Sequence, residues 1–228
     1  MRQVTFYFAF AVFVSIGRVA SGQSIYVDMD GGFGGAEVGT GAPSSSFAGA
    51  AGVPGYWNQV QAGNGGPWQL RDADGELDTV SMSWTGSGAS FGFNNPALTG
   101  DFRLLMADAE MVGAGGLRYE ISGLAPGEYR VFTYACKPQG QALTSFITVP
   151  GSTQGTVAVT GPMPPNFFVA GVTHSIHDVN SLTGTIRIQA AEIQNSYVNG
   201  FQLLAVPEPA TVFACAFGLA ILIRRTRM

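Results

Sequence analysis

Short runs in which apolar and polar residues alternate recur along the chain, separated by glycine, proline or asparagine. In residues 79–84, for example, Val80, Met82 and Trp84 share one parity, and small hydroxyl side chains occupy the other. A period of two over this length favours β-strands that bury one face. The other runs of this kind are residues 24–29, 118–121, 129–134, 145–149, 156–159, 167–172, 185–188 and 197–204.

These runs predict an all-β fold, an antiparallel β-sandwich of jelly-roll type, in a single domain over residues 23–205. Only residues 102–111 have a pattern that allows a helical turn or two. Pro126 and Gly127 predict a type II turn that leads into the strand at 129–134. Asp74-Gly75 predicts a loop that reverses residues 68–70 into the strand at 79–84.

The composition narrows the class of protein further. Charged residues make up only 11% of the chain, whereas glycine accounts for 32 residues and proline for 12. Low charge with many turn formers fits an extracellular β domain better than a cytosolic enzyme. Residues 23–206 contain six Lys and Arg against fourteen Asp and Glu, a net charge of about −8. This acidic body offers no electrostatic surface for nucleic acid.

Cysteine use excludes a disulfide framework. Cys136 lies in the predicted domain and Cys215 in a C-terminal apolar run, so the two are not expected to pair. An inert, partly buried thiol is the expectation for Cys136. Stability must then come from the core, for which 16 Phe, 7 Tyr and 3 Trp are available.

The N-terminus has the pattern of a secretory signal peptide. Arg2 gives a positive start, residues 4–16 are apolar, and Ala20-Ser21-Gly22 supplies small residues for cleavage. The apolar part is too short for a stable membrane span. We therefore expect residues 1–22 to be a cleaved signal peptide and the protein to be exported.

Three chemically distinct segments follow one another at the C-terminus. They are a kinked polar motif, an apolar run at residues 210–223 and a cationic end. The residues of the motif and of the end are Pro207, Glu208, Pro209, Arg224, Arg225 and Arg227. As a helix, fourteen residues span about 21 Å, less than the roughly 30 Å of a bilayer core. The arginines favour the cytoplasmic side, which predicts that the body faces outward.

This order resembles the PEP-CTERM sorting signal of Gram-negative envelope proteins. The resemblance covers residues 206–228 and implies an exosortase-type transpeptidase as partner, a short C-terminal transmembrane helix before processing, and an envelope or extracellular location afterwards. A plain single-pass anchor and a buried C-terminal helix are the alternatives.

The body resembles the same proteins. Residues 47–58 are similar to the F-x-x-A-x-G-x-x-G-x-W-N element of PEP-CTERM-bearing envelope proteins from bacteria such as planctomycetes. A D-x-D-G hairpin, an L-x-P-G-x-Y turn and an N-G-x-x-L strand follow in the same order at residues 72–75, 124–129 and 199–203. The architecture that this resemblance implies is a galactose-binding-like or malectin-like sandwich. It implies a fold and a location, and no reaction.

A cluster of carboxylates is the first candidate site. Asp72, Asp74 and Asp78, with Glu76, lie within seven residues, and Ca²⁺ prefers such oxygen ligands. The spacing does not match an EF-hand loop, so a solvated hairpin tip is the favoured alternative. Asp28 and Asp30 form a second acidic corner with a weaker cation signal. No other cofactor is expected.

Aromatic and histidine side chains give the remaining candidates. Tyr56 and Trp57 lie in a glycine- and proline-rich loop, where they could stack on sugar rings; a tryptophan that plugs one end of the sandwich is the commoner alternative. His174 and His177 are three apart, so on a strand they point to opposite faces and cannot chelate one metal ion.

These features predict an exported cell-envelope or extracellular-matrix protein. Its body is expected to be a structural or adhesive β-sandwich with no enzymatic activity. Carbohydrate binding, to extracellular polysaccharide, is the alternative for the same body. A secreted hydrolase ranks below both, because no nucleophile motif or acid pair stands out from the sequence.

Overall fold

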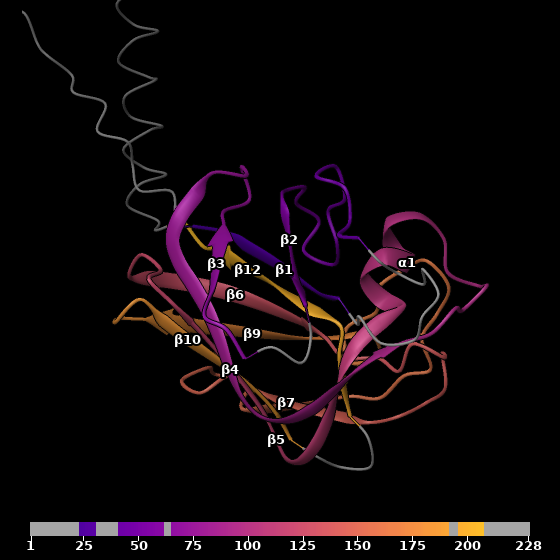
Figure 1. The fold of residues 1–228 in the computed structure, drawn as a ribbon. Coiled ribbons are helices and arrows are strands. Elements are labelled where there is room, and N and C mark those ends of the chain that lie inside the picture. Colours follow the sequence, from indigo (N-terminus) through magenta and orange to yellow (C-terminus); the bar gives the residue numbers. More distant parts are fainter. Residues whose placement is uncertain (1–22, 31–40, 62–64, 192–195, 208–228) are drawn as a thin grey trace, which may run out of the picture.

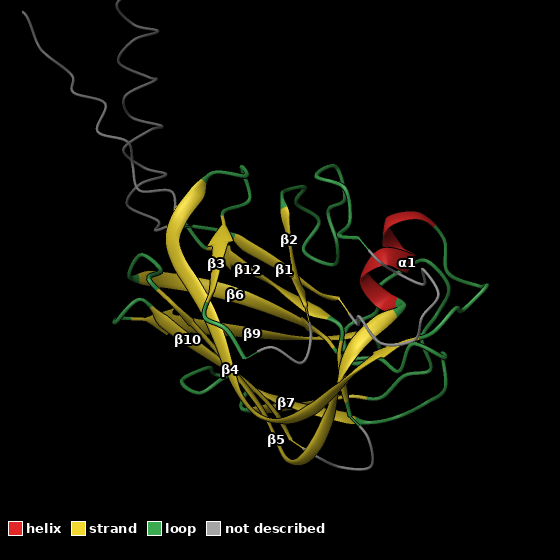
Figure 2. Cartoon of the chain, viewed as in Figure 1, coloured by secondary structure: helices red, strands yellow, loops and turns green. Residues whose placement is uncertain are grey.

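The computed structural model describes residues 23–30, 41–61, 65–191 and 196–207. Within them, two β-sheets pack face to face and one short helix lies at the side (Figures 1 and 2). No helix among the described residues has the length and hydropathy that crossing a membrane requires. The predicted signal peptide and the sorting residues Glu208, Pro209, Arg224, Arg225 and Arg227 lie outside the described residues, which end at Pro207.

One sheet, named here the β1 sheet, has the strand order β2-β1-β12-β6-β9. Its strands are β1 (Ile25–Asp30), β2 (Trp57–Gln61), β6 (Gly127–Tyr134), β9 (His174–Ser181) and β12 (Gly200–Ala205). All of its pairs are antiparallel except β1 with β2, which is parallel. The prediction of an antiparallel sheet is therefore wrong for this pair, because the chain between β1 and β2 is long enough for the crossover that parallel strands need.

The other sheet, the β5 sheet, has the order β3-β4-β5-β10-β7-β8, and β11 also pairs with β5. Its strands are β3 (Trp68–Arg71), β4 (Leu77–Gly92), β5 (Asp108–Ser122), β7 (Ser145–Thr148), β8 (Thr156–Val159), β10 (Thr185–Ala191) and β11 (Tyr197–Val198). Figure 1 shows the long strands β4 and β5 curving around one side of the sandwich. Helix α1 (Gly100–Met106) connects them.

The strand order confirms the predicted sandwich. The four-strand sets β1-β12-β6-β9 and β5-β10-β7-β8 have the order of a jelly roll, with the first and last strands adjacent. Strands β2, β3 and β4 are additions at the sheet edges. The predicted Asp74-Gly75 hairpin is confirmed between β3 and β4, and the predicted turn precedes β6, where the Tyr129 hydroxyl donates a hydrogen bond to the Ala125 carbonyl at 2.7 Å.

Two segments differ from the prediction. Residues 167–172 do not form a strand, because Asn166 adopts φ 56° and the amides of Val172 and Thr173 both donate to the Val169 carbonyl in a reverse turn. The strand predicted at residues 197–204 is divided at Asn199. The buried side-chain amide of Asn199 donates a hydrogen bond to the Asp108 carbonyl at 2.7 Å and accepts one from the backbone amide of Cys136 at 2.8 Å.

The core lies between the sheets. It includes the β4 side chains that were predicted to point inward, Val80, Met82 and Trp84. A second apolar cluster covers the outer face of the β1 sheet, where α1 and the loop around Phe47 pack on Tyr26, Trp57 and Tyr134. The outer face of the β5 sheet instead carries exposed or half-buried polar side chains. That face is the one left open to solvent.

Candidate functional site

Trp57 does not form a binding platform. Its side chain is 2% exposed, its indole nitrogen donates to the Phe47 carbonyl at 3.1 Å, and its ring centre lies 5.3 Å from that of Tyr26. Trp57 therefore offers no free ring face to a sugar. It is buried, as the commoner alternative expected, but it is the first residue of β2 and packs on the outer face of the β1 sheet, not at an end of the sandwich.

Tyr56, the other predicted aromatic, remains at the surface. Its side chain is 38% exposed and packs on Gly75 of the β3–β4 hairpin, with the Arg71 guanidinium carbon 5.9 Å from the ring centre. Arg71 itself donates to the Gly75 carbonyl at 2.8 Å. Tyr56 is thus a single exposed ring that supports the hairpin, with no second aromatic residue paired with it among the aromatic contacts of the described residues.

The predicted acidic cluster forms the hairpin turn. Asp72 Oδ1 accepts hydrogen bonds from the amides of Asp74 at 3.0 Å and Glu76 at 2.9 Å, and Asp78 Oδ1 accepts from the Thr79 amide at 2.6 Å. No group of three metal-ligating side chains occurs in the part of the chain that the structure describes. The geometry favours the solvated hairpin tip over a calcium site.

The two histidines occupy separate, buried environments on β9. His174 packs among aromatic rings, lies 3.0 Å from the Thr173 hydroxyl, and has its pKa lowered to about 4 by burial. His177 Nε2 lies 3.1 Å from the Gly155 carbonyl, and burial lowers its pKa as well. The two imidazoles therefore act as neutral core residues.

The second acidic corner proves to be buried. Asp28 is 0% exposed, and neither of its carboxylate oxygens has a hydrogen-bond partner among the described residues. Burial raises the pKa of Asp28 well above its ordinary value, and the nearby charge of Asp30 adds to the effect. Asp30 itself accepts a hydrogen bond from the Gln59 amide. Burial of the only thiol described, Cys136, similarly raises its pKa to about 12, as expected for an inert cysteine.

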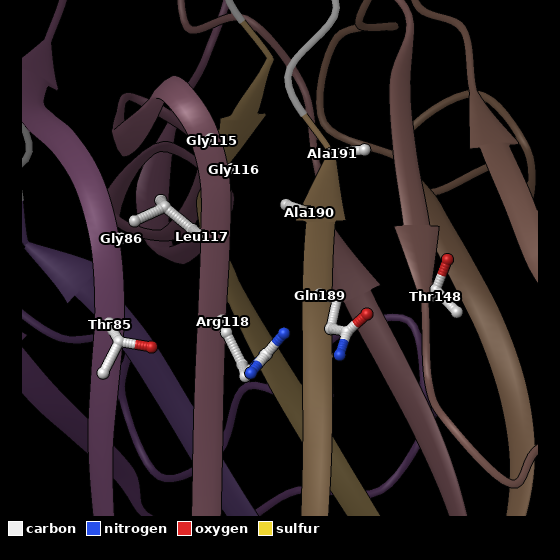
Figure 3. Close-up of a pocket in the computed structure, with 10 residues that line it drawn as sticks. All are labelled: Thr85, Gly86, Gly115, Gly116, Leu117, Arg118, Thr148, Gln189, Ala190 and Ala191. Atoms are coloured by element: carbon white, nitrogen blue, oxygen red, sulfur yellow. The ribbon is translucent and has the colours of Figure 1, made fainter.

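A groove that the sequence did not reveal lies on the outer face of the β5 sheet. It has a volume of about 540 Å³. Four polar side chains from four adjacent strands form a row along it, because each is the cross-strand partner of the next (Figure 3). The row consists of Thr85 on β4, Arg118 on β5, Gln189 on β10 and Thr148 on β7.

Glycines at one end of the row occupy positions where a side chain would collide with the neighbouring strand. A Cβ atom on Gly86 would lie 2.2 Å from the Gly116 carbonyl oxygen, and one on Gly116 would lie 2.7 Å from the Ala190 carbonyl oxygen. The β4–β5 register shifts between Gly86 and Gly88, as at a β-bulge. Since Gly86, Gly115 and Gly116 have no side chains to fill the space, the sheet surface is hollow there.

The neighbouring row on the same face differs in its charge pairing. Ser83, Glu120 and Arg187 are cross-strand partners, and Arg187 Nε donates to Glu120 Oε2 at 2.8 Å. Arg118 is exposed and makes no ion pair within the described part of the chain. Its five N–H donors, with the Gln189 amide and the two threonine hydroxyls, can hydrogen-bond to hydroxyl or carboxylate oxygens.

The sequence contained part of this signal. The alternation at residues 118–121 could have marked Arg118 as a side chain that leaves the core, whereas Thr85 and Gln189 lie one residue beyond the runs predicted at 79–84 and 185–188. The order and register of the strands were needed to align Thr85, Arg118 and Gln189 in one row, and neither can be read from the alternation alone.

Known proteins offer only distant likenesses. No protein-family model matches the chain, and no curated protein matches its sequence. Among solved structures, a carbohydrate-binding module, TmCBM61, in complex with β-1,4-galactotriose is 14% identical, with a TM-score of 0.27, over 54% of this chain and 88% of that one. An exo-β-1,3-galactanase from Phanerochaete chrysosporium, with galactose, is 14% identical, with a TM-score of 0.30, over 68% of this chain and 35% of that one.

A peptidoglycan O-acetylesterase is 18% identical, with a TM-score of 0.32, over 62% of this chain and 35% of that one. The chain thus spans about a third of the length of the esterase and of the galactanase. At these scores the likenesses assign no function to this chain.

Proposed function

We propose that this protein is a non-catalytic, polysaccharide-binding protein of the cell envelope or extracellular matrix, and that the groove on the β5 sheet is its binding surface. The observation on which the proposal depends is the row Thr85, Arg118, Gln189 and Thr148, in which hydrogen-bonding side chains of four strands face solvent together.

The dimensions of the row suit an extended ligand. Neighbouring strands lie about 4.8 Å apart, so four strands span roughly 14 Å. Thr156 on β8 extends the row by one strand, since it pairs with Thr148 and their hydroxyls lie 2.8 Å apart. A row of this length contacts several units of a polymer at once, and its donors and acceptors match a ligand that is rich in hydroxyl groups.

The described lining of the groove lacks the groups that hydrolysis needs. Among the described residues that line it, none has a carboxylate, an imidazole or a thiol. Glycoside hydrolysis ordinarily uses two carboxylic acids on either side of the scissile bond. The lining therefore supports binding ahead of a secreted hydrolase, and such binding would give the protein the adhesive role expected from its sequence.

The proposed location rests on the two ends of the sequence. Residues 1–22 provide the pattern of a cleaved export signal, and residues 206–228 resemble a PEP-CTERM signal handled by an exosortase-type transpeptidase. The intact mass of the protein isolated from its native envelope tests this part. Loss of the segment after Pro209 would support processing, whereas a mass that includes Met228 would leave a plain anchor.

Binding is tested with the full-length protein in affinity electrophoresis against a panel of neutral and acidic polysaccharides. Substitution Gln189→Leu removes the amide in the row, and we expect it to weaken binding about two- to tenfold, as for the loss of one or two neutral hydrogen bonds. Ser83→Ala on the same face is the matched control and should bind normally. Binding that is lost in Tyr56→Ala but kept in Gln189→Leu would move the site to the hairpin loop.

A further inference from the structure

We infer that the groove selects polysaccharides that contain carboxylate groups, such as uronic acid units, and that Arg118 binds the carboxylate. This inference rests on the proposed function, because it assigns a class of ligand to the same groove. It starts from the charge of the row, in which Arg118 is the one ionised side chain among four hydrogen-bonding groups.

The two arginines of this face differ in what they contact. Arg187 has its guanidinium occupied by Glu120, at 2.8 Å. Arg118, one row away on the adjacent strand, has Thr85 and Gln189 as its cross-strand neighbours, and neither is an anion. An exposed guanidinium without an internal carboxylate retains its planar set of donors for a ligand, and this set matches a carboxylate in bidentate geometry.

The flanking side chains complete a site for an acidic sugar. The Gln189 amide and the Thr85 hydroxyl lie on either side of Arg118 in the row (Figure 3). Both can donate and accept hydrogen bonds, so they can contact the ring hydroxyls of a sugar whose carboxylate is bound by Arg118. A neutral sugar has no carboxylate, so it could not form a charge-assisted hydrogen bond with the Arg118 guanidinium.

The charge of the whole body restricts the ligand further. Residues 23–206 carry a net charge of about −8, which repels a highly charged polyanion at long range. A single cation in a hydrogen-bonding row therefore suits a polymer with isolated or spaced carboxylates, bound at short range. It does not suit nucleic acid, which needs an extended basic surface.

The test compares two forms of one polymer in isothermal titration with the full-length protein: a pectin in which most galacturonate units are methyl-esterified and spaced units keep a free carboxylate, and the same pectin after complete esterification. We expect the form with free carboxylates to bind about tenfold more tightly than the fully esterified form, since a charge-assisted hydrogen bond is stronger than a neutral one. Arg118→Gln should abolish this difference. Arg118→Lys should retain only part of the preference for the acidic polymer, because lysine keeps the charge but lacks the planar donors.

A double substitution, Glu120→Gln with Arg187→Gln, is the matched control, since it removes a neighbouring pair of charges and leaves Arg118 in place. Its preference for the acidic polymer should be unchanged, and the melting temperatures of all variants check that they fold. Equal binding of both polymers, with both weakened in Gln189→Leu, would overturn the inference and leave the proposed function standing. Binding of neither polymer, nor of any in the wider panel, would overturn both.

Discussion

The two outer faces of the sandwich come from the same alternation of inward and outward residues, but one face is covered by other parts of the chain and the other is exposed to solvent. On the β1 sheet, the outward side chains are large and aromatic, such as Tyr26, Trp57 and Tyr134, and α1 and the loop around Phe47 cover them. On the β5 sheet they are short or polar, such as Thr85, Arg118 and Gln189, and they stay in contact with solvent. Burial of apolar area stabilises the first face, and hydrogen-bonding capacity makes the second available for a ligand.

On each face, an ionisable side chain forms no ion pair with any described residue. Asp28 is enclosed on the covered face, where its raised pKa favours the neutral acid. Arg118 lies on the open face, where water or a ligand can solvate its charge. An ionisable side chain without an ion-pair partner is thus accommodated in this fold in one of two ways. Asp28 is buried and is favoured as the neutral acid, whereas Arg118 keeps its charge at the surface, where it can bind a ligand.

The largest expected effect is on the covered face. Trp57→Ala should lower the free energy of unfolding by about 3–5 kcal/mol, because it removes a buried aromatic side chain from the cluster under α1. Chemical denaturation followed by circular dichroism measures the change. Tyr56→Ala, the exposed neighbour, is the control and should cost much less. Similar losses for the two variants would contradict the assignment of Trp57 to the core.

Acid should destabilise the covered face through His174. Its folded pKa is about 4, whereas the unfolded pKa is near 6.5, so the unfolded chain binds more protons between these values and stability falls as the pH drops through this window. The loss attributable to His174 by pH 4.5 should be about 2–3 kcal/mol. His174→Gln should remove this part of the pH dependence. An identical pH profile in both proteins would show that His174 is solvated.

On the open face, substitution of Gly86 should lower stability more than substitution of Gly115. Gly86→Ala should lower the free energy of unfolding by about 1–3 kcal/mol, because the new Cβ meets the Gly116 carbonyl and the backbone has φ 122°. Gly115, whose Cβ would meet no atom within 4 Å, offers a comparison for the strain of a positive φ alone. Thermal unfolding of Gly86→Ala and Gly115→Ala separates the clash from the backbone strain, and equal losses would contradict the clash expected at Gly86.

The smallest effect should come from Asp28. Since its folded pKa is raised, the native state is favoured at low pH and loses stability as the pH rises above about 3.8 towards the folded value. Asp28→Asn keeps the shape but cannot ionise, so it should be more stable than the wild type at pH 8 by about 1 kcal/mol. Melting curves at pH 4 and pH 8 measure this. A variant that is less stable than the wild type at pH 8 would indicate that a charged Asp28 is needed.

The class of fold was predictable because it depends on local alternation. The inward parity of Val80, Met82 and Trp84 follows from the sequence, and so does the turn before β6. The reverse turn at residues 167–172 was not predictable, because it depends on Asn166, whose side-chain amide donates to the Ala97 carbonyl and accepts from the Thr99 amide far away in sequence. The β1–β2 pair was missed for a similar reason, since a parallel pairing has no local signal.

The candidate site was less accessible to prediction. An exposed aromatic loop was a reasonable interpretation of residues 56 and 57, yet burial separates the two side chains, with Tyr56 outside and Trp57 inside. The alternation at residues 118–121 only places Arg118 outside the core, and it does not mark a site, because an isolated arginine in a strand is common on solvated faces. It became a candidate only when the register placed it between Thr85 and Gln189, opposite no carboxylate.

The most direct test of the central claim is amide chemical-shift mapping of the isotope-labelled protein with oligogalacturonate. If the open face of the β5 sheet is the binding surface, the largest shifts will fall on the amides around Thr85, Arg118, Gln189 and Thr148, and the amides near Trp57 will not move. Shifts that cluster instead around Tyr56 and the β3–β4 hairpin, with the row unchanged, would contradict the account.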